Sequence, residues 1–212
     1  MKKQPDTINT ADEIKQLKKL LSACKKKSKA LEDLSMKDTL TNLYNRRHFD
    51  DVFHREIQRA ERENKTLSFS ILDVDNLKKY NDCNGHEEGN NLLKSIAEVL
   101  DEATHRGSDF IFRLGGEEFG ILFTDLNEEA ALSYMDNIRA KIQDMNISHS
   151  LNDNLKIATA SFGLVVVDFS KESIHETGLY SMADHALHDA KQNGRNQVVL
   201  HAAQGSEDLE FF

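Results

Sequence analysis

The chain has 212 residues, of which 39% are hydrophobic, which is enough for one domain with a sizeable core and an extension. Its two cysteines, Cys24 and Cys83, lie far apart without CxxC or Cys/His spacing, which argues against a zinc site or a disulfide framework. No apolar run approaches the roughly eighteen residues of a membrane span, and the polar start does not resemble a signal peptide. We therefore expect a cytoplasmic protein that does not bind membranes.

The net charge of −9 is unevenly distributed along the chain. Residues 1–37 contain ten lysines and five acids, so residues 38–212 carry a net charge of −14. An acidic folded part argues against a nucleic-acid polymer as partner. A small anionic substrate would have to be held by a few well-placed bases and by metal ions.

The spacing of apolar residues near the N-terminus predicts a coiled-coil helix over residues 11–37 that pairs two copies into a homodimer, after a disordered segment 1–10. The seam repeats at intervals of three and four residues: Ile14, Leu17, Leu21, Cys24, Ser28, Leu31 and Ser35. Small residues at three seam positions leave a lone surface helix as the alternative, because short helices are marginal in water. In a parallel pair, Cys24 would face its own copy.

Beyond residue 38 the patterns of period 3.6 and period 2 alternate. Helices are expected over Tyr44 to Arg62, from Leu77 until a break at Gly85 to Gly89, and over Leu92 to Leu100, Glu128 to Met145 and Leu179 to Gln192. Strands are expected over Leu67 to Leu72, in a hairpin at 109–123, as a pair or one long strand within 156–168, and over Gln197 to Leu200, before a disordered tail at 203–212. This order predicts an α/β fold, ferredoxin-like, with a mainly antiparallel sheet flanked by helices.

The hairpin carries the most informative motif, Arg113-Leu-Gly-Gly-Glu-Glu-Phe119. Gly115 and Gly116 can adopt the positive φ angles of a short turn and let a bulky ligand approach the backbone. The adjacent carboxylates of Glu117 and Glu118 repel each other unless a cation lies beside them, so the motif suggests a Mg²⁺-phosphate site. An exposed acidic turn is the alternative.

A second acid, Asp73, is expected with Asp75 just beyond the strand that ends at Leu72. If that strand pairs with the hairpin, Asp73 and Glu117 lie at the same sheet end and can share metal ions. Two carboxylates that hold Mg²⁺ ions on a triphosphate form a polymerase-type site for in-line attack on phosphorus. Alternatively, Asp73 only caps the strand end.

Five motifs in order resemble the GGDEF family of diguanylate cyclases, in its GGEEF variant. They are Asp38-Thr-Leu-Thr-Asn-Leu-Tyr-Asn-Arg-Arg47, Asp73-Val-Asp-Asn-Leu-Lys-Lys-Tyr-Asn-Asp82, Gly85-His86 with Gly89, the hairpin motif, and Ala183-Asp184 with Ala190-Lys191 and Gly194-Arg195-Asn196. The resemblance implies a palm-like nucleotidyl-cyclase domain over residues 38–202. It also implies condensation of two GTP into cyclic di-GMP and two pyrophosphates in a head-to-head dimer with one nucleotide per subunit.

The resemblance also implies roles for single residues. Asp73 and Glu117, with the Val74 carbonyl, would ligate two Mg²⁺ ions, with Mn²⁺ as an alternative, and Glu118 would lie beside the metals and the reacting hydroxyl. Positive charge for the triphosphate would come from three bases, Lys78, Lys191 and Arg195.

Base recognition is where this chain departs from the family. Asn81 would hydrogen-bond guanine, but its usual aspartate partner is replaced by Asn90. A carboxylate accepts from both guanine N1–H and N2–H, whereas an amide offers one acceptor and one donor, a mismatch of about 1–3 kcal/mol. An amide instead complements adenine, so ATP use and a mixed cyclic GMP–AMP product are one hypothesis, and weakened guanine binding is the other.

Arg106 and Asp109 lie where the family has its RxxD product-inhibition site, at which cyclic di-GMP would bind. A surface salt bridge is the alternative for this four-residue pattern. Two further hypotheses concern the whole chain. It could be a non-catalytic module that binds GTP or cyclic di-GMP, or a dimerisation adaptor that uses the N-terminal helix alone.

Overall fold

The computed structural model describes residues 10–104, 107, 109–152, 155–171 and 173–201, with only the backbone at 10–13 and 28–35. The chain divides into two compact units, residues 1–37 and 38–212. The first contains α1 (Thr10–Met36), the continuous helix that the spacing predicts. Ile14, Leu17 and Leu21 are each more than half exposed, at 53%, 64% and 57%. Among the described helices, none has the length and apolarity needed to cross a membrane.

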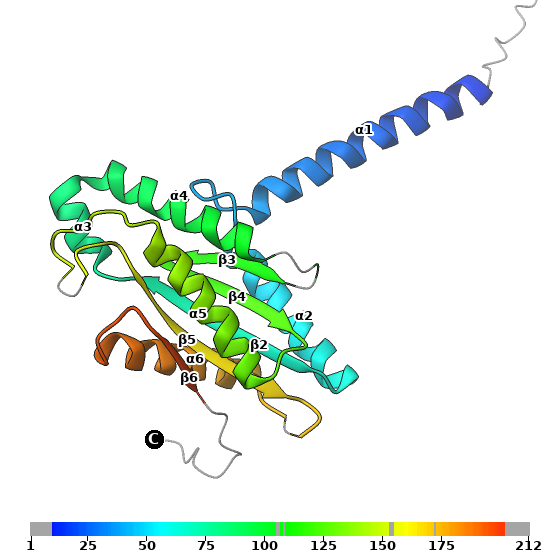
Figure 1. Ribbon diagram of the computed structural model, residues 1–212. Helices are drawn as coiled ribbons and strands as arrows, with labels where there is room; N and C mark the ends of the chain where they lie inside the picture. Colours follow the sequence, from blue (N-terminus) through cyan, green and yellow to red (C-terminus); the bar gives the residue numbers. More distant parts are fainter. Residues whose placement is uncertain (1–9, 105–106, 108, 153–154, 172, 202–212) are drawn as a thin grey trace, which may run out of the picture. The chain divides into compact units, whose positions relative to one another are not determined.

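The described residues of the second unit form a six-stranded sheet in the order β1-β3-β4-β2-β5-β6 (Figure 1). Its strands are β1 (Tyr44–Asn45), β2 (Thr66–Val74), β3 (Phe110–Gly115), β4 (Glu118–Thr124), β5 (Ala160–Asp168) and β6 (Val198–His201). The four central strands pair antiparallel, whereas β1 and β6 join the two edges in parallel. The predicted, mainly antiparallel sheet is therefore confirmed.

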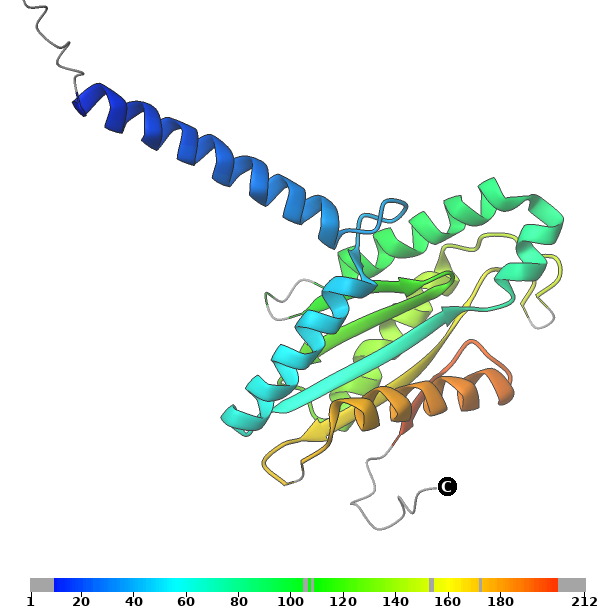
Figure 2. The same ribbon diagram turned by 180° about the vertical axis from the view of Figure 1, so that it is seen from behind.

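Helices cover both faces of this sheet. α4 (His86–Ala103) and α5 (Glu128–Asp144) lie on one face, and α3 (Leu77–Asn84) connects β2 to α4 (Figure 1). On the other face lie α2 (Arg46–Glu63) and α6 (Glu176–Gln192), which are in front in Figure 2. The succession β2-α4-β3-β4-α5-β5 has the ferredoxin-like topology that the sequence predicts.

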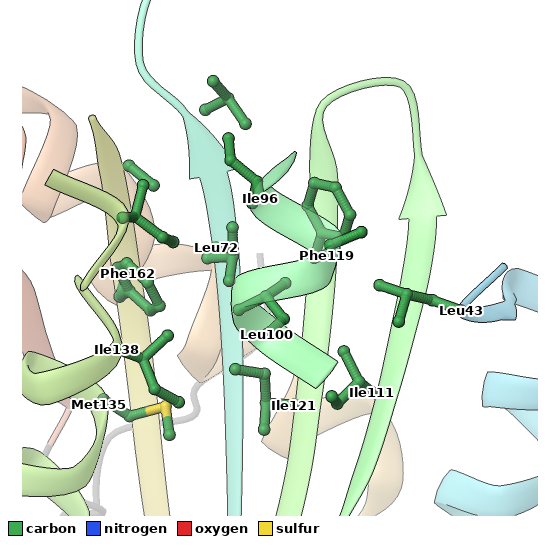
Figure 3. Packing of buried hydrophobic residues seen from close by; sticks show 14 of the residues in the cluster. Leu43, Leu72, Ile96, Leu100, Ile111, Phe119, Ile121, Met135, Ile138 and Phe162 are labelled. Carbon is green, nitrogen blue, oxygen red and sulfur yellow. The ribbon is translucent and has the colours of Figure 1, made fainter. Parts of the chain in front are cut away.

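The sheet separates two hydrophobic cores. Along β5, Phe162 and Leu164 belong to the core beneath α4 and α5, whereas Val165 and Val167 belong to the core beneath α2 and α6, as the period of two in a strand requires. Figure 3 shows the first core, where Phe162, Leu72 and Phe119 from neighbouring strands meet Ile96 and Leu100 of α4. Both faces of the central strands are thus buried.

Gly163 brings α6 directly onto β5. A Cβ at this position would lie 2.1 Å from the carbonyl oxygen of Ala183 and 2.3 Å from the nitrogen of Leu187, both in the α6 backbone. Only glycine permits this close approach. The contact fixes the distance of α6 from the sheet and so the position of Lys191 in its last turn.

Several predicted boundaries are wrong. The helix expected from Tyr44 begins at Arg46, because Tyr44 and Asn45 pair with β3 as the short strand β1, which the sequence spacing does not predict. β2 continues to Val74, so that Asp73 lies within the strand and not beyond it. The break predicted over Gly85 to Gly89 is confined to Gly85, at φ 89°, because Gly89 is a helical residue of α4. The expected helix start at Leu92 therefore moves back to His86. Of the two options left open for 156–168, the single long strand β5 is found.

Candidate active site

The candidate site lies where β2 and β4 pair beside the hairpin turn. Asp73 is paired in register with Glu118, and the strand alternation puts both on the face covered by α6. Asp73 is only 5% exposed. Like charges directly opposite each other on paired strands are destabilising, so this pair lowers the stability of the fold locally, as is common at functional sites.

Among the described residues, one base faces these acids. Lys191 Nζ lies 2.9 Å from Asp73 Oδ2. Burial, with the nearby charges of Glu117 and Glu118, nevertheless raises the pKa of Asp73 to about 6, against the lowering effect of Lys191. Burial also raises the pKa of Glu117, with Lys191 opposing it and Glu118 adding to it. The site therefore holds more negative charge than its one close lysine offsets.

Hydrogen bonds from Arg113 stabilise the turn that carries Glu117. Gly116 and Glu117 form the two-residue loop between the paired residues Gly115 and Glu118, and Gly116 has φ 48°, a conformation that favours glycine. Arg113 donates to the Gly116 carbonyl from Nη2 at 2.8 Å and from Nε at 3.2 Å. Its Nη1 also donates to Asp38 Oδ1 at 2.9 Å.

Asp38 anchors this arginine. Burial alone would raise the pKa of the Asp38 carboxyl, but hydrogen bonds from Arg113 and Thr41 outweigh it and lower the pKa. The same oxygen accepts from the backbone nitrogens of Leu40 and Thr41. The loop at the start of the domain is thus linked through one guanidinium to the acidic turn.

The donor set at this strand end fits Mg²⁺. Val74 N donates to the Glu117 carbonyl at 3.2 Å, which ties the turn to β2 next to Asp73. Within the described residues no three His, Cys, Asp or Glu side chains form a complete metal cage. Mg²⁺ does not need one, because it is usually bound by one or two carboxylates together with water and substrate phosphates. The buried Asp73 and the half-buried Glu117, whose pKa values are both raised, are the carboxylates that such a cation would neutralise.

The other two predicted phosphate ligands lie outside this cluster. Lys78 is exposed in the first turn of α3, and Arg195 is exposed in the loop after α6. In the described part of the chain neither side chain forms an ion pair within 4.0 Å. Arg195 lines a hollow of about 220 Å³ together with Asn152, Leu155, Thr159, Gly194 and Asn196. A larger hollow of about 570 Å³, between α5 and the β6 edge, contains none of the predicted site residues.

The two asparagines proposed for base recognition are brought together by α3 and α4. The side chain of Asn81 packs on Gly89, where a Cβ would lie 1.7 Å from its Oδ1, and Asn90 follows directly in α4 and is exposed. Asn81 Oδ1 is buried without a hydrogen-bond partner among the described atoms. Such an unpaired oxygen costs about 1–3 kcal/mol.

A buried carboxylate two residues after Asp73 has a role that the sequence did not predict. Asp75 is 1% exposed and accepts from Thr159 Oγ1 and Ser161 Oγ at 2.7 Å and from Asn196 N at 3.1 Å. These bonds join the ends of β2 and β5 to the loop that carries Arg195. The alternation of small hydroxyl residues in Thr159-Ala-Ser161 is the one signal that could have suggested buried partners for an acid.

The proposed product-inhibition pair is only partly within the described residues, since Arg106 lies outside them. Asp109, just before β3, accepts a hydrogen bond from Tyr134 Oη at 3.2 Å. The same hydroxyl donates to the Ala103 carbonyl at 3.1 Å. This bond links the start of the hairpin to α4 and α5.

Comparison with known proteins gives concordant matches. The model of the GGDEF family, described as diguanylate cyclase, GGDEF domain, matches residues 35–197. The probable diguanylate cyclase DgcT of Escherichia coli K12 is 33% identical over 174 residues, which cover 80% of this chain and 36% of DgcT. The diguanylate cyclase DosC of the same strain is 34% identical over 163 residues, which cover 77% of this chain and 34% of DosC. The chain thus spans about a third of these relatives.

A solved structure matches a larger share. The coiled coil and GGDEF domain of DgcB from Caulobacter crescentus, in complex with c-di-GMP, superimposes with a TM-score of 0.79 at 26% identity. The match covers 91% of this chain and 100% of the DgcB chain. The structural match therefore covers more of the chain than residues 35–197, which the GGDEF family model matches.

Proposed function

Because the chain belongs to the GGDEF family, we propose that it is a diguanylate cyclase that condenses two GTP into cyclic di-GMP with release of two pyrophosphates. The observation that carries the proposal is the convergence of Asp73, Glu117 and Glu118 at one strand end, opposite Lys191. A cluster of one buried and two half-buried acids has no evident structural use and fits a site that binds cations with a triphosphate.

In this reaction the 3′-hydroxyl of each GTP attacks the α-phosphorus of the other. The hydroxyl loses its proton, a new phosphodiester bond forms, and the bond to pyrophosphate breaks. Mg²⁺, two ions per site, or Mn²⁺ in its place, would supply charge neutralisation and a lowered pKa of the attacking hydroxyl. Asp73, Glu117 and the Val74 carbonyl would hold these ions, with Glu118 beside the attacking hydroxyl.

The remaining residues bind and orient the nucleotide. Lys191 neutralises charge at the base of the site, and the exposed Lys78 and Arg195 reach the triphosphate from α3 and from the loop after α6. Gly115 and Gly116 carry no side chain that would keep a ligand from the turn. Asn81 and Asn90 bind the base, and the unpaired Asn81 oxygen is an acceptor that a base N–H would satisfy.

The reaction requires two subunits, because each site holds one nucleotide. The exposed apolar residues Ile14, Leu17 and Leu21 of α1 support pairing as a coiled coil, with residues 38–202 as the catalytic domain. Segment 1–10 and tail 203–212 lie outside it. Cyclic di-GMP would also bind at Arg106 and Asp109 as an inhibitor.

A second candidate is a cyclase with relaxed base choice. It rests on the exposed Asn90, which adjoins the Asn81 contact on α4. An amide pair can match the N1 and N6 edge of adenine. Replacing Asn90 with aspartate separates the two candidates. If ATP is used, Asn90→Asp shifts the GTP-to-ATP preference about tenfold or more towards GTP, whereas a GTP-only enzyme changes mainly in KM.

The non-catalytic alternative is tested by pyrophosphate release from GTP and Mg²⁺. Turnover by the wild type that disappears in Glu117→Ala supports the cyclase. Nucleotide binding without pyrophosphate release supports a regulatory module instead. Retained turnover in Glu117→Ala would show that the metal site has been assigned to the wrong residues.

A further inference from the structure

The loop after α6 has an unusual backbone. Gly194, Arg195 and Asn196 follow one another with positive φ angles of 108°, 63° and 47°. For arginine in particular the left-handed region is unfavourable, and such conformations persist only where surrounding contacts impose them. Arg195 is one of the proposed triphosphate ligands, so the contacts that impose this shape also set where its guanidinium can reach.

Arg195 N itself donates to the Ala190 carbonyl at 3.0 Å. Two further groups of contacts hold the loop, and both act on Asn196. From the sheet side, Asn196 N donates to Asp75 Oδ2 and to Ser161 Oγ, each at 3.1 Å. On the α5 side the amide makes two bonds: its Nδ2 donates to Gln143 Oε1 at 2.8 Å, and its Oδ1 accepts from Arg139 Nη1 at 3.1 Å. The residue next to Arg195 is thus fixed at both its backbone and its side chain.

Arg139 and Gln143 form a closed arrangement. Arg139 Nη1 also donates to Gln143 Oε1 at 2.9 Å, so each of the three side chains is bonded to the other two. The Arg139 side chain is 17% exposed, and its Nε is paired with Asp136 at 2.6 Å, which fixes the guanidinium plane. Mutual hydrogen bonds of this kind rigidify the side chains that form them.

We propose that Arg139 and Gln143 are positioning residues for the triphosphate. They lie on α5, touch no proposed substrate atom, and act by holding Asn196 so that the preceding Arg195 keeps its left-handed backbone. The inference rests on the proposed role of Arg195 in nucleotide binding. A phosphate ligand held in advance binds without the loss of loop freedom, so its effect appears in nucleotide affinity.

Arg139 and Gln143 together are called the clamp. The test is a double-mutant cycle between the clamp and Arg195. Arg139→Met and Gln143→Leu remove the donors and the acceptor, whereas Gln143→Glu keeps an acceptor for both Arg139 and Asn196. Each is combined with Arg195→Ala, and three quantities are measured: KM and kcat for GTP, and the Kd of a non-reacting GTP analogue with Mg²⁺. Arg59→Met removes an exposed arginine of α2, away from the loop, as the control.

We expect Arg139→Met and Gln143→Leu to raise KM and Kd about tenfold with a smaller change in kcat. Gln143→Glu and Arg59→Met should stay within about twofold of the wild type. In the Arg195→Ala background the clamp substitutions should change Kd less than twofold, because the side chain that they position is absent. An equal loss of affinity in both backgrounds would show a general structural effect and overturn the proposal.

The cycle also separates this inference from the proposed activity. If the wild type binds the analogue but forms no cyclic product, the cyclase assignment fails and the coupling is still read from Kd. If the wild type makes product and the substitutions are additive in Kd, the clamp fails while the cyclase stands. Loss of folding in a variant is recognised from its Tm. If Arg139→Met and Gln143→Leu do not fold, Gln143→Glu is compared with the wild type instead. Because it preserves the contacts, an affinity outside the expected twofold range contradicts the proposal.

Discussion

Lys191, in the last turn of α6, lies 2.9 Å from the carboxylate of Asp73, the penultimate residue of β2. Gly163 makes this contact possible, because it lets α6 lie directly on β5. The lysine faces a buried acid whose pKa is still raised, to about 6, by burial and by Glu117 and Glu118. The ionised site is therefore unfavourable for the fold without bound cations.

Asp73→Asn should abolish turnover and stabilise the metal-free protein at pH 8. The shift of the Asp73 pKa from 3.8 to about 6 corresponds to a net cost of roughly 3 kcal/mol for the ionised form, in which the favourable contact with Lys191 is already included. We expect Tm with EDTA to rise by a few degrees. Asp168→Asn is the control of opposite sign, since hydrogen bonds from Ser170 and Lys171 lower the pKa of Asp168 to about 2. A lower Tm in Asp73→Asn would contradict this account.

The pH dependence of the Asp73→Asn difference has a defined sign. A carboxyl whose folded pKa is raised above its unfolded value favours folding at low pH, and this contribution is lost as pH rises from 3.8 through about 6. The stability advantage of Asp73→Asn should therefore vanish near pH 4 and be complete above pH 7. Mg²⁺ competes with the proton, so its stabilisation of the wild type should increase over the same interval. Thermal unfolding at pH 4 to 8, with and without Mg²⁺, measures both effects.

Gly89→Ala should weaken nucleotide binding although alanine favours helices. At an ordinary helical glycine the change stabilises by up to about 1 kcal/mol. At Gly89 the new Cβ would lie 1.7 Å from Asn81 Oδ1, so the Asn81 side chain must move. Gly178→Ala in α6 is the matched control, because its closest neighbour, Ile174 Cγ1, is at an ordinary 3.4 Å. KM for GTP should rise in Gly89→Ala alone. Equal KM values in the two variants would show that Asn81 does not bind the nucleotide.

Asp38→Ala should destabilise the domain and reduce turnover together. The substitution removes the acceptor of Arg113, which then no longer holds the Gly116 carbonyl as firmly. We expect a loss of about 1–3 kcal/mol in the free energy of unfolding. Asp50→Ala breaks an exposed pair with Arg46 and should cost less than about 0.5 kcal/mol. Urea unfolding and GTP turnover of both variants show whether the Asp38–Arg113 pair contributes more to stability and turnover than the Asp50–Arg46 pair.

Oxidation tests the pairing of α1. In a parallel coiled coil Cys24 faces its copy, so a Cys83→Ser variant should form a Cys24 disulfide dimer under mild oxidation and return to monomer on reduction. The same reaction with Cys24→Ser in addition is the control. Cross-linked and uncross-linked samples with the same turnover would support a parallel arm, whereas a monomer at micromolar concentration would exclude it.

Much of the fold follows from the sequence because its patterns are local. The hairpin around Gly115 and Gly116 and the period of helix α2 are confirmed, since alternation and turn residues define them within a few positions. The boundary at Gly89 was wrong for a tertiary reason. This glycine is required by the approach of Asn81, not by a turn, and sequence spacing does not distinguish the two.

The site was less predictable than the fold. Asp73 and Glu118 are opposite each other because of strand register, which a short motif does not specify. The partners of Asp75 lie 84, 86 and 121 residues further along the chain, so that its burial could not be read from its neighbours. Arg139 likewise could not be singled out from the other arginines in helices, because its contact with Asn196 depends on the tertiary fold.

The central claim is tested most directly by mass analysis of the product formed from equal concentrations of GTP and ATP with Mg²⁺. The proposed function predicts cyclic di-GMP and pyrophosphate in a ratio of one to two, with no product in Glu117→Ala. A mixed cyclic GMP–AMP product would favour the relaxed-specificity candidate. No cyclic dinucleotide and no pyrophosphate from the folded, nucleotide-bound protein would contradict the proposal that it is a cyclase.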